Sequence, residues 1–214
     1  MEKLIVRGGR PLKGKVTVSG SKNASLPILA AALLTDELCV LEGVPPLRDV
    51  HTMIRILRNL GVKVVQEGQR ITLDPSGYQG TEAPYKLVST MRASFCVLGP
   101  LIAKKKQANV SLPGGCVIGP RPVDLHLKGL KALGARLKVE GGNVLAQARE
   151  LRGTTMYLGG AYGSSVLGTA NVMMAACLAK GRTMIESAAC EPELVDLAHV
   201  LIKMGAKIEG AGTP

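Results

Sequence analysis

The feature that most constrains the fold is a short motif that occurs three times along the chain. A leucine, two further residues and a leucine or methionine precede Gly61, Gly134 and Gly205. The spacing of roughly 70 residues is too long for a solenoid repeat and suits a supersecondary unit used three times in one domain. Each copy predicts an amphipathic helix that ends at the motif, a left-handed glycine after the helix, and then an alternating strand.

A second, more apolar helix is expected earlier in each unit. The stretches 25–34, 94–103 and 169–179 are rich in alanine and leucine and contain no charged residue. Helices that are apolar all round are buried. The sequence therefore predicts an α/β fold built as a threefold repeat of βαβαββ-like units, with three buried helices at the centre and sheets outside.

Two segments at the ends of the chain do not fit the repeat. Residues 1–18 contain two short apolar stretches, 3–6 and 15–18, that predict strands separated by a Gly/Pro turn. The first two units continue into a further strand at 70–73 and 143–146, but the third unit has no such strand before Pro214. We expect one domain at 19–214, truncated before its last strand, with residues 1–18 outside it.

The charge balance points to an anionic partner. The chain has 27 Lys and Arg against 16 Asp and Glu, a formal net charge of +11. The basic residues are spread along the chain, which argues against a disordered nucleic-acid-binding tail. Only 104–106 form a lysine run, and we interpret this run as a solvated helix end. Nucleic acid and phosphorylated metabolites are both candidate anions on charge alone, and of the two we expect no nucleic acid.

The cysteines and the apolar runs favour a cytoplasmic protein. Five cysteines occur, none of them in C-x-x-C spacing, so neither a zinc site nor a disulfide framework is indicated. Cys39, Cys96 and Cys177 have apolar neighbours and are interpreted as small core residues. No secretory signal and no apolar run of membrane-spanning length is found, so we expect no membrane partner.

A loop around Cys116 is the strongest candidate for chemistry. Residues 112–122 contain three glycines and three prolines, which favour a loop that can cover a ligand. Access and a nearby cation, here Arg121, both favour a reactive thiolate. The alternative is an ordinary exposed cysteine in a turn, and the spacing alone does not decide between them.

Two cations stand at the heads of buried helices. Lys22, followed by Asn23, opens the first of these helices, and Arg92 has a similar place in the second. Cations that converge with helix N-termini form a site for a polyanion, so we expect both residues at one mouth of the domain. The alternatives are a plain helix cap with a solvated lysine and a surface ion pair of the arginine.

Two further pairs of polar residues are given structural roles. Asp124 and His126 stand where a helix begins, and we favour a cap and a local hydrogen bond over catalysis. Glu191 and Glu193 flank Pro192 at another helix start, where their charge complements the helix dipole.

Four of these motifs, in order along the whole chain, resemble the UDP-N-acetylglucosamine 1-carboxyvinyltransferase family. They are Lys22-Asn-Ala-Ser-Leu-Pro, Thr90-Met-Arg-Ala-Ser, the run from Leu112 to His126, and Ala-x-Glu191-Pro-Glu. The resemblance implies an inside-out α/β barrel of two domains, of which this chain is the N-terminal half. Residues 1–18 would then belong to the missing C-terminal domain.

The resemblance also implies a reaction and roles for particular residues. Members of the family transfer enolpyruvyl from phosphoenolpyruvate to the 3′-hydroxyl of UDP-N-acetylglucosamine and release phosphate, with no cofactor or metal. Cys116 would donate a proton to the methylene carbon of phosphoenolpyruvate and could form a covalent adduct. Lys22 and Arg121, helped by Asn23, would hold the phosphate and carboxylate. The sugar nucleotide would contact Arg92, Arg121, Pro122, Val123, Asp124, Leu125, Ser165 and Val166.

Two departures from the family pattern bear on this assignment. A lysine that is common in the stretch matching 163–168 is absent here, and Cys96 stands where tryptophan is common. Two other functions stay open. One is a non-catalytic anion-binding half-domain. The other is an enzyme resembling 3-phosphoshikimate 1-carboxyvinyltransferase, which the Pro-Gly-Gly-Cys loop argues against.

Overall fold

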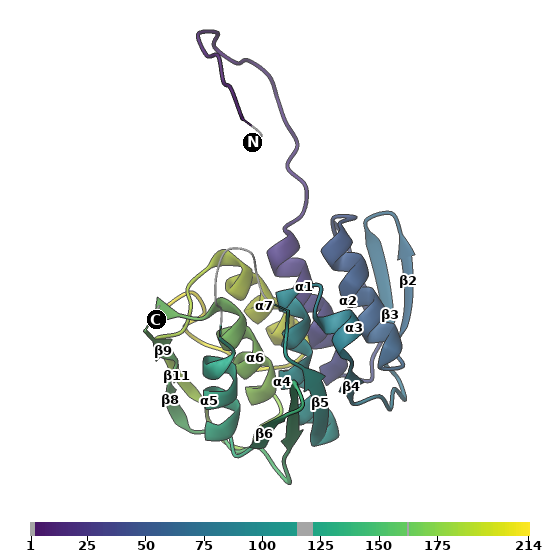
Figure 1. Ribbon diagram of the computed structural model, residues 1–214, viewed down its shortest axis with the longest axis vertical. Helices are drawn as coiled ribbons and strands as arrows, with labels where there is room; N and C mark the ends of the chain where they lie inside the picture. Colours follow the sequence, from purple (N-terminus) through teal and green to yellow (C-terminus); the bar gives the residue numbers. More distant parts are fainter. Residues whose placement is uncertain (1–2, 115–121, 162) are drawn as a thin grey trace.

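A computed structural model describes residues 3–114, 122–161 and 163–214, and its fold is α/β (Figure 1). The helices are α1 Lys22–Ala31, α2 Arg48–Asn59, α3 Tyr85–Val88, α4 Leu98–Lys105, α5 Asp124–Ala132, α6 Val166–Ala176 and α7 Pro192–Lys203, with 3₁₀ turns η1 Ala32–Leu34 and η2 Arg92–Val97. The strands are β1 Cys39–Leu41, β2 Lys63–Glu67, β3 Arg70–Asp74, β4 Glu82–Ala83, β5 Gln107–Ser111, β6 Arg136–Glu140, β7 Asn143–Gln147, β8 Thr155–Tyr157, β9 Gly159–Gly160, β10 Gly163–Ser164 and β11 Met184–Glu186.

The threefold repeat is confirmed, and its middle copy is the most complete. That unit runs β4, α4, β5, α5, β6, β7 and forms a four-stranded sheet in the order β4-β5-β7-β6. The first unit has the three-stranded sheet β1-β3-β2, in which β3 pairs antiparallel with both neighbours. The third unit has the parallel pair β8 and β11. Compared with the middle unit, and within the described residues, the first unit has no opening strand and the third has no closing hairpin.

The three predicted apolar helices lie at the centre of the molecule. They correspond to α1 with η1, η2 with α4, and α6, and Figure 1 shows them between sheets on the outside. Leu29, Leu98 and Val172, one from each, are fully buried. Packing of η2 against α1 and of α4 against η1 means that the first two run in the same direction. Their N-termini therefore lie at one end of the domain, here called the starting end.

The recurring glycines end the outer helices α2, α5 and α7 as the sequence predicts. Gly61, Gly134 and Gly205 have φ of +99°, +97° and +102°, a left-handed conformation that costs little only for glycine. The residue after each glycine donates its N–H to the first leucine of the motif, a Schellman arrangement that satisfies the last turn. These bonds are Val62 N to Leu57 O at 3.0 Å, Ala135 N to Leu130 O at 3.1 Å and Ala206 N to Leu201 O at 3.0 Å.

The strand expected after Gly205 is wrong, and the strands expected at 3–6 and 15–18 do not form within this chain, so their assignment to a second domain stays a prediction. Residues 3–21 and 206–209 lie in no strand, and residues 3–21 extend away from the body (Figure 1). Leu4 and Val16 are 92% and 86% exposed. A strand needs a hydrogen-bonding neighbour, as β2 has in β3 and β6 in β7. No described residue of this chain supplies that neighbour to either segment.

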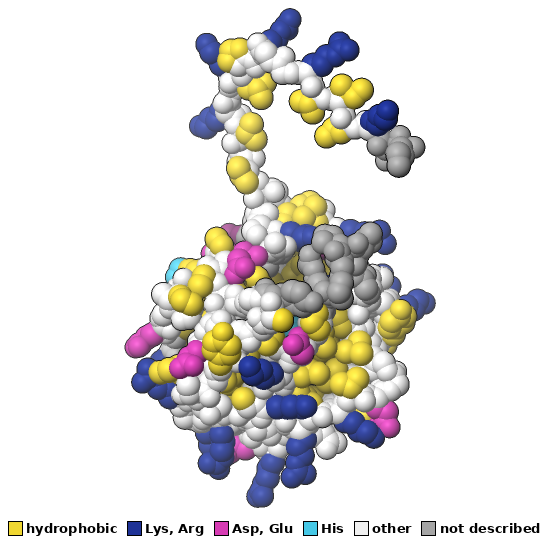
Figure 2. All heavy atoms as spheres, turned by 60° about the vertical axis from the view of Figure 1, so that its left-hand side comes forward, with side chains coloured by type: hydrophobic (Ala, Val, Ile, Leu, Met, Phe, Trp, Pro, Cys, Tyr) yellow, Lys and Arg dark blue, Asp and Glu magenta, His cyan; other side chains and the backbone are white. Residues whose placement is uncertain are grey.

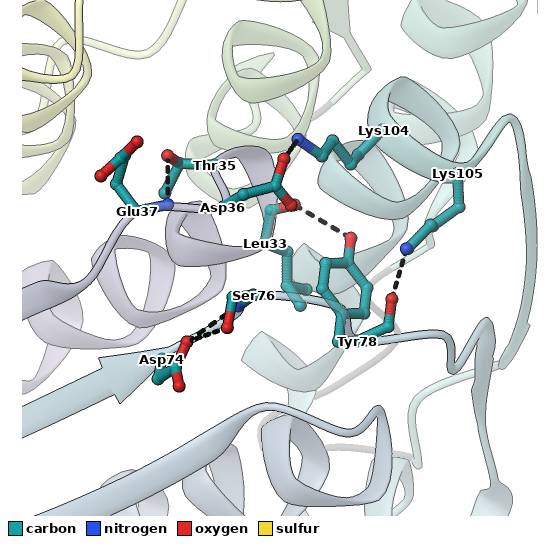
Figure 3. Close-up of polar contacts among 9 residues, drawn as sticks. All are labelled: Leu33, Thr35, Asp36, Glu37, Asp74, Ser76, Tyr78, Lys104 and Lys105. Atoms are coloured by element: carbon teal, nitrogen blue, oxygen red, sulfur yellow. Dashed lines mark hydrogen bonds and ion pairs between the residues drawn. The ribbon is translucent and has the colours of Figure 1, made fainter.

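The end of the domain opposite the starting end, here called the finishing end, contains a dense polar cluster (Figure 3). Buried Tyr78 donates its hydroxyl to Leu33 O at 2.9 Å, where η1 ends. The ammonium of Lys105, from the end of α4, bonds Tyr78 O and lies 4.1 Å from the centre of the tyrosine ring. Lys104 forms a 2.6 Å ion pair with Asp36. The cluster therefore ties the ends of two buried helices to the connection that follows β3.

Candidate active site at the helix starts

The first buried helix begins with a capped turn and an exposed lysine. Ser21 Oγ accepts from Ala24 N at 3.3 Å and thereby satisfies one free N–H of α1. Lys22 and Asn23 follow, and both are exposed. Lys22 Nζ lies 2.8 Å from Asp49 Oδ2 in the first turn of α2, so the lysine is paired with a carboxylate in this structure. An exposed pair of this kind is worth ~0–1 kcal/mol, which an anionic ligand can replace.

The first residue of the second buried helix bonds the backbone at residue 122, which follows the Cys116 loop. Arg92 is the first residue of η2, and its guanidinium donates to Pro122 O at 2.9 Å. Lys22 and Arg92 thus both lie at the starting end, as expected for a convergent anion site. Cys116 and Arg121 lie outside the described residues, so their predicted roles stay predictions.

The start of the third buried helix contains two more of the predicted substrate-binding residues. Ser165 is the N-cap of α6 and accepts from Gly168 N at 3.1 Å, with Val166 as the first helical residue. A Cβ added at Gly168 would lie 2.9 Å from Ser165 Oγ and 3.6 Å from Leu125 Cβ. Leu125 therefore packs close to the start of α6, and the absence of a side chain at Gly168 permits this approach.

The predicted roles of Asp124 and His126 are partly corrected. Asp124 is the first residue of α5 rather than its cap, which is Val123. It still stands where the helix dipole favours a negative charge. His126 is a hydrogen-bonding residue as predicted, but its partner Asn171 is distant in sequence, at 2.9 Å. Glu191 is the N-cap residue of α7 and Glu193 lies in its first turn, which fits their structural assignment.

Asn171 is the residue that the sequence interpretation missed. It is fully buried in the middle of α6, with bonds to Phe95 O and Gly99 N in addition to His126. The signal available in the sequence was an amide within an otherwise apolar, uncharged helix. Such a group is kept in a core only where partners satisfy it.

The described cysteines differ in access. Cys96 is fully buried, and burial raises the pKa of its thiol to about 12. Burial raises the pKa of Cys177 to about 11, and burial followed by Glu37 raises that of Cys39. These last two are half-buried rather than core residues, which corrects the expectation. Cys190 is exposed and close to Ala188 O. None of the described cysteines is in a disulfide.

Neither of two surface hollows of the described chain contains the helix starts. One, of about 520 Å³, is lined by Lys106, Arg136, Arg149 and their neighbours at the edge of the β5–β7 sheet. The other, of about 1010 Å³, is lined by residues of α6, α7 and the segments 181–185 and 205–214. Figure 2 shows basic side chains scattered over the visible surface and along residues 3–21.

A family model described as EPSP synthase (3-phosphoshikimate 1-carboxyvinyltransferase) matches residues 6–214. The chain belongs to the EPSP synthase family. Within the described residues of this family member, no helix has the length and apolarity to cross a membrane. No group of three potential metal ligands occurs there either.

The curated relatives of this family member share one name. Proteins named UDP-N-acetylglucosamine 1-carboxyvinyltransferase are 59% identical in Methylacidiphilum infernorum, 54% in Desulfatibacillum aliphaticivorans and 53% in Akkermansia muciniphila. Each match covers 100% of this chain and 50–51% of the relative. The chain therefore spans about half the length of the curated relatives that it matches, and corresponds to their N-terminal half.

Solved structures support the fold. The enolpyruvyl transferase NikO from Streptomyces tendae matches with a TM-score of 0.79 at 23% identity, over 94% of this chain and 47% of that one. An EPSP synthase from Acinetobacter baumannii matches with a TM-score of 0.72 at 21% identity, over 95% and 47%. The enolpyruvyl transferase fold expected from the sequence is thus confirmed for this half.

Proposed function

We propose that the full-length protein transfers enolpyruvyl from phosphoenolpyruvate to the 3′-hydroxyl of UDP-N-acetylglucosamine and releases phosphate. The observation that carries the proposal is 53–59% identity, over the whole chain, to proteins named for this activity. The starting end supports it, because Lys22, Arg92 and the N-termini of α1 and η2 gather there. Both substrates are anions, and cations at helix N-termini suit anions.

The reaction proceeds by addition and elimination. The sugar hydroxyl adds to C2 of phosphoenolpyruvate and gives its proton to a base in the second half of the protein, while Cys116 supplies a proton to C3, giving a tetrahedral intermediate. Loss of phosphate, with return of one C3 proton to the Cys116 thiolate, then restores the double bond. Lys22, with Asn23 and Arg121, holds the phosphate and carboxylate, and an incoming phosphate takes Asp49's place on the lysine. Arg92, the 122–125 run, Ser165 and Val166 hold the sugar nucleotide.

The product commits the sugar nucleotide to peptidoglycan synthesis, and we place the reaction in the cytoplasm. Unpaired thiols at the four described cysteines are typical of a reducing compartment. We further propose that residues 3–18 pair with strands of a second domain. Their apolar side chains, such as Leu4 and Val18, are 92% and 87% exposed and have no neighbour within the described chain.

Phosphate release with paired acceptors tests the reaction. The full-length protein should turn over phosphoenolpyruvate with UDP-N-acetylglucosamine and not with shikimate 3-phosphate, while residues 1–214 alone should give no turnover. The opposite acceptor preference would assign the chain to the other activity of the family. Turnover by residues 1–214 at the full-length rate would show that the second half is not needed.

Fosfomycin labelling tests the role of Cys116. The phosphonate epoxide mimics phosphoenolpyruvate and should alkylate Cys116, whose thiolate is the reactive form. Exposed Cys190 is the internal control for non-specific alkylation. Cys116→Asp should resist the drug and retain some activity, because a carboxylic acid still donates a proton. Label on Cys190 with Cys116 unmodified would contradict the assignment.

A further inference from the structure

The side-chain amide of Asn171 links two repeat units in the centre of the domain. Asn171 lies on α6 of the third unit, and all its polar partners belong to the second unit. Its Oδ1 accepts from Gly99 N at 2.6 Å, and its Nδ2 donates to Phe95 O at 2.9 Å. Asn171 Nδ2 also lies 2.9 Å from Nδ1 of His126 on α5. One buried amide therefore joins three elements.

The backbone of the second buried helix needs this amide. The helix changes from 3₁₀ to α at Leu98, whose N–H still donates to Phe95 O. The next N–H, on Gly99, donates instead to Asn171, and Pro100 has no N–H. A Cβ at Gly99 would collide with Asn171 O, so glycine permits the close approach. These contacts fix the amide, with its oxygen toward Gly99 and its nitrogen toward His126.

The fixed amide determines which hydrogen bond His126 makes. Because Asn171 Nδ2 can only donate, Nδ1 of His126 must accept, and the ring proton is on Nε2. The ring is buried, and its centre lies 5.2 Å from that of Phe95, edge to face. His126 is thus held by the middle of α6 and by η2, although it belongs to the first turn of α5.

These contacts determine the position of residues 122–125. Arg92 holds Pro122 O at one end of this run, and Asn171 holds His126 immediately after its other end. We propose that Asn171 and His126 are positioning residues that fix the 122–125 run for the sugar nucleotide. This inference rests on the proposed function, because it needs that run to contact UDP-N-acetylglucosamine. Neither residue touches the substrate.

Two substitutions at His126 in the full-length protein separate positioning from mere packing. His126→Asn offers an amide oxygen near the place of Nδ1, so it keeps the acceptor for Asn171. His126→Leu is similar in size but removes the acceptor. We expect His126→Leu to raise KM and Kd for UDP-N-acetylglucosamine about tenfold, and His126→Asn to stay within about twofold of the wild type. KM for phosphoenolpyruvate should change by less than about twofold in both variants.

A control variant separates the expected effect from a general loss of stability. Ile56→Val, in the buried face of α2, gives a modest loss of stability without touching α5, and should leave both KM values unchanged. If His126→Leu does not fold, His126→Met replaces it, since an unbranched thioether adapts to the same cavity. Equal KM values in the acceptor-free and Asn variants would overturn the proposal, as would a parallel rise for both substrates. Absence of UDP-N-acetylglucosamine binding by the wild type would instead refute the proposed function.

Discussion

The starting and finishing ends of the domain are built from the two ends of the same buried helices, yet their side chains are organised differently. At the starting end Lys22 and Asn23 are exposed, and the lysine has a single carboxylate partner. At the finishing end Tyr78 is 2% exposed, and its ring, hydroxyl and carbonyl each have a partner (Figure 3). The finishing end thus holds its polar side chains in fixed contacts with one another, while the starting end keeps groups that a ligand can engage.

The largest expected effect is on activity and comes from the starting end. Lys22→Ala in the full-length protein should lower kcat/KM by about 10²–10³-fold, because a charge that stabilises the departing phosphate is lost. Its melting temperature should be nearly unchanged, since the exposed pair with Asp49 contributes ~0–1 kcal/mol. Steady-state kinetics and thermal melting provide the two measurements.

Lys104→Ala is the matched control at the finishing end. Lys104 also pairs with one aspartate, Asp36, at 2.6 Å. Its removal should leave kcat/KM within about twofold and change stability by ~1 kcal/mol or less. Equal losses of activity in the two lysine variants would break the contrast between the ends.

Part of this contrast could be predicted from the sequence, because it depends on local patterns. Apolar composition predicts the buried helices. The recurring glycines predict the ends of the outer helices, because a left-handed position favours glycine. Lys22 and Arg92 were placed at one end because the repeat makes their helices equivalent. The shared position of these two cations can thus be predicted from their place within a unit, while their role in binding stays a prediction.

The rest depends on contacts between elements that are distant in sequence, which no local pattern encodes. The pair of Lys22 with Asp49 spans 27 residues, and the bond of Asn171 to His126 spans 45. The strands expected at 3–6, 15–18 and 206–209 have strand-like sequences, but a strand forms only beside another strand. Tyr78 gave no signal either, because its partners come from η1 and α4.

The stability of the protein should depend on pH through the starting end, because His126 is a buried titratable group near it. Burial, and then the charge of Arg92, lower its pKa to about 3. Below about pH 6.5 the unfolded chain binds a proton that the folded chain refuses, so stability falls as pH falls, by up to ~1.4 kcal/mol per pH unit. Between pH 7 and pH 5 we expect a loss of about 2 kcal/mol from this residue.

His126→Asn isolates that loss from the titration of carboxylates, which both proteins share. Urea unfolding at the two pH values should show a smaller fall for the variant, by about 2 kcal/mol. Identical falls in both proteins would mean that the imidazole takes up its proton in the folded state as readily as in the unfolded chain.

A smaller effect on stability is expected from the finishing end. Tyr78→Phe keeps the ring beside Lys105 and removes only the hydroxyl, leaving Leu33 O without that donor. The loss should be about 1–2 kcal/mol in chemical unfolding, with kcat/KM unchanged. Tyr85→Phe is the control, because Tyr85 is 65% exposed and should unfold as the wild type does. A fall in kcat/KM for Tyr78→Phe would connect the two ends functionally and contradict their separation.

The smallest expected effect concerns the turn that ends α5. Gly134 has φ of +97°, and a Cβ there would meet only Glu150 O at 3.6 Å, so backbone strain rather than collision opposes substitution. Gly134→Ala should cost about 1 kcal/mol in unfolding free energy. Gly134→Asn should cost less, because asparagine enters the left-handed region more readily. Activity should follow the wild type in both variants, since the turn is needed for folding and lies outside the proposed substrate contacts. Equal costs for Ala and Asn would show that steric contact, and not φ, determines the preference for glycine at this position of the repeat.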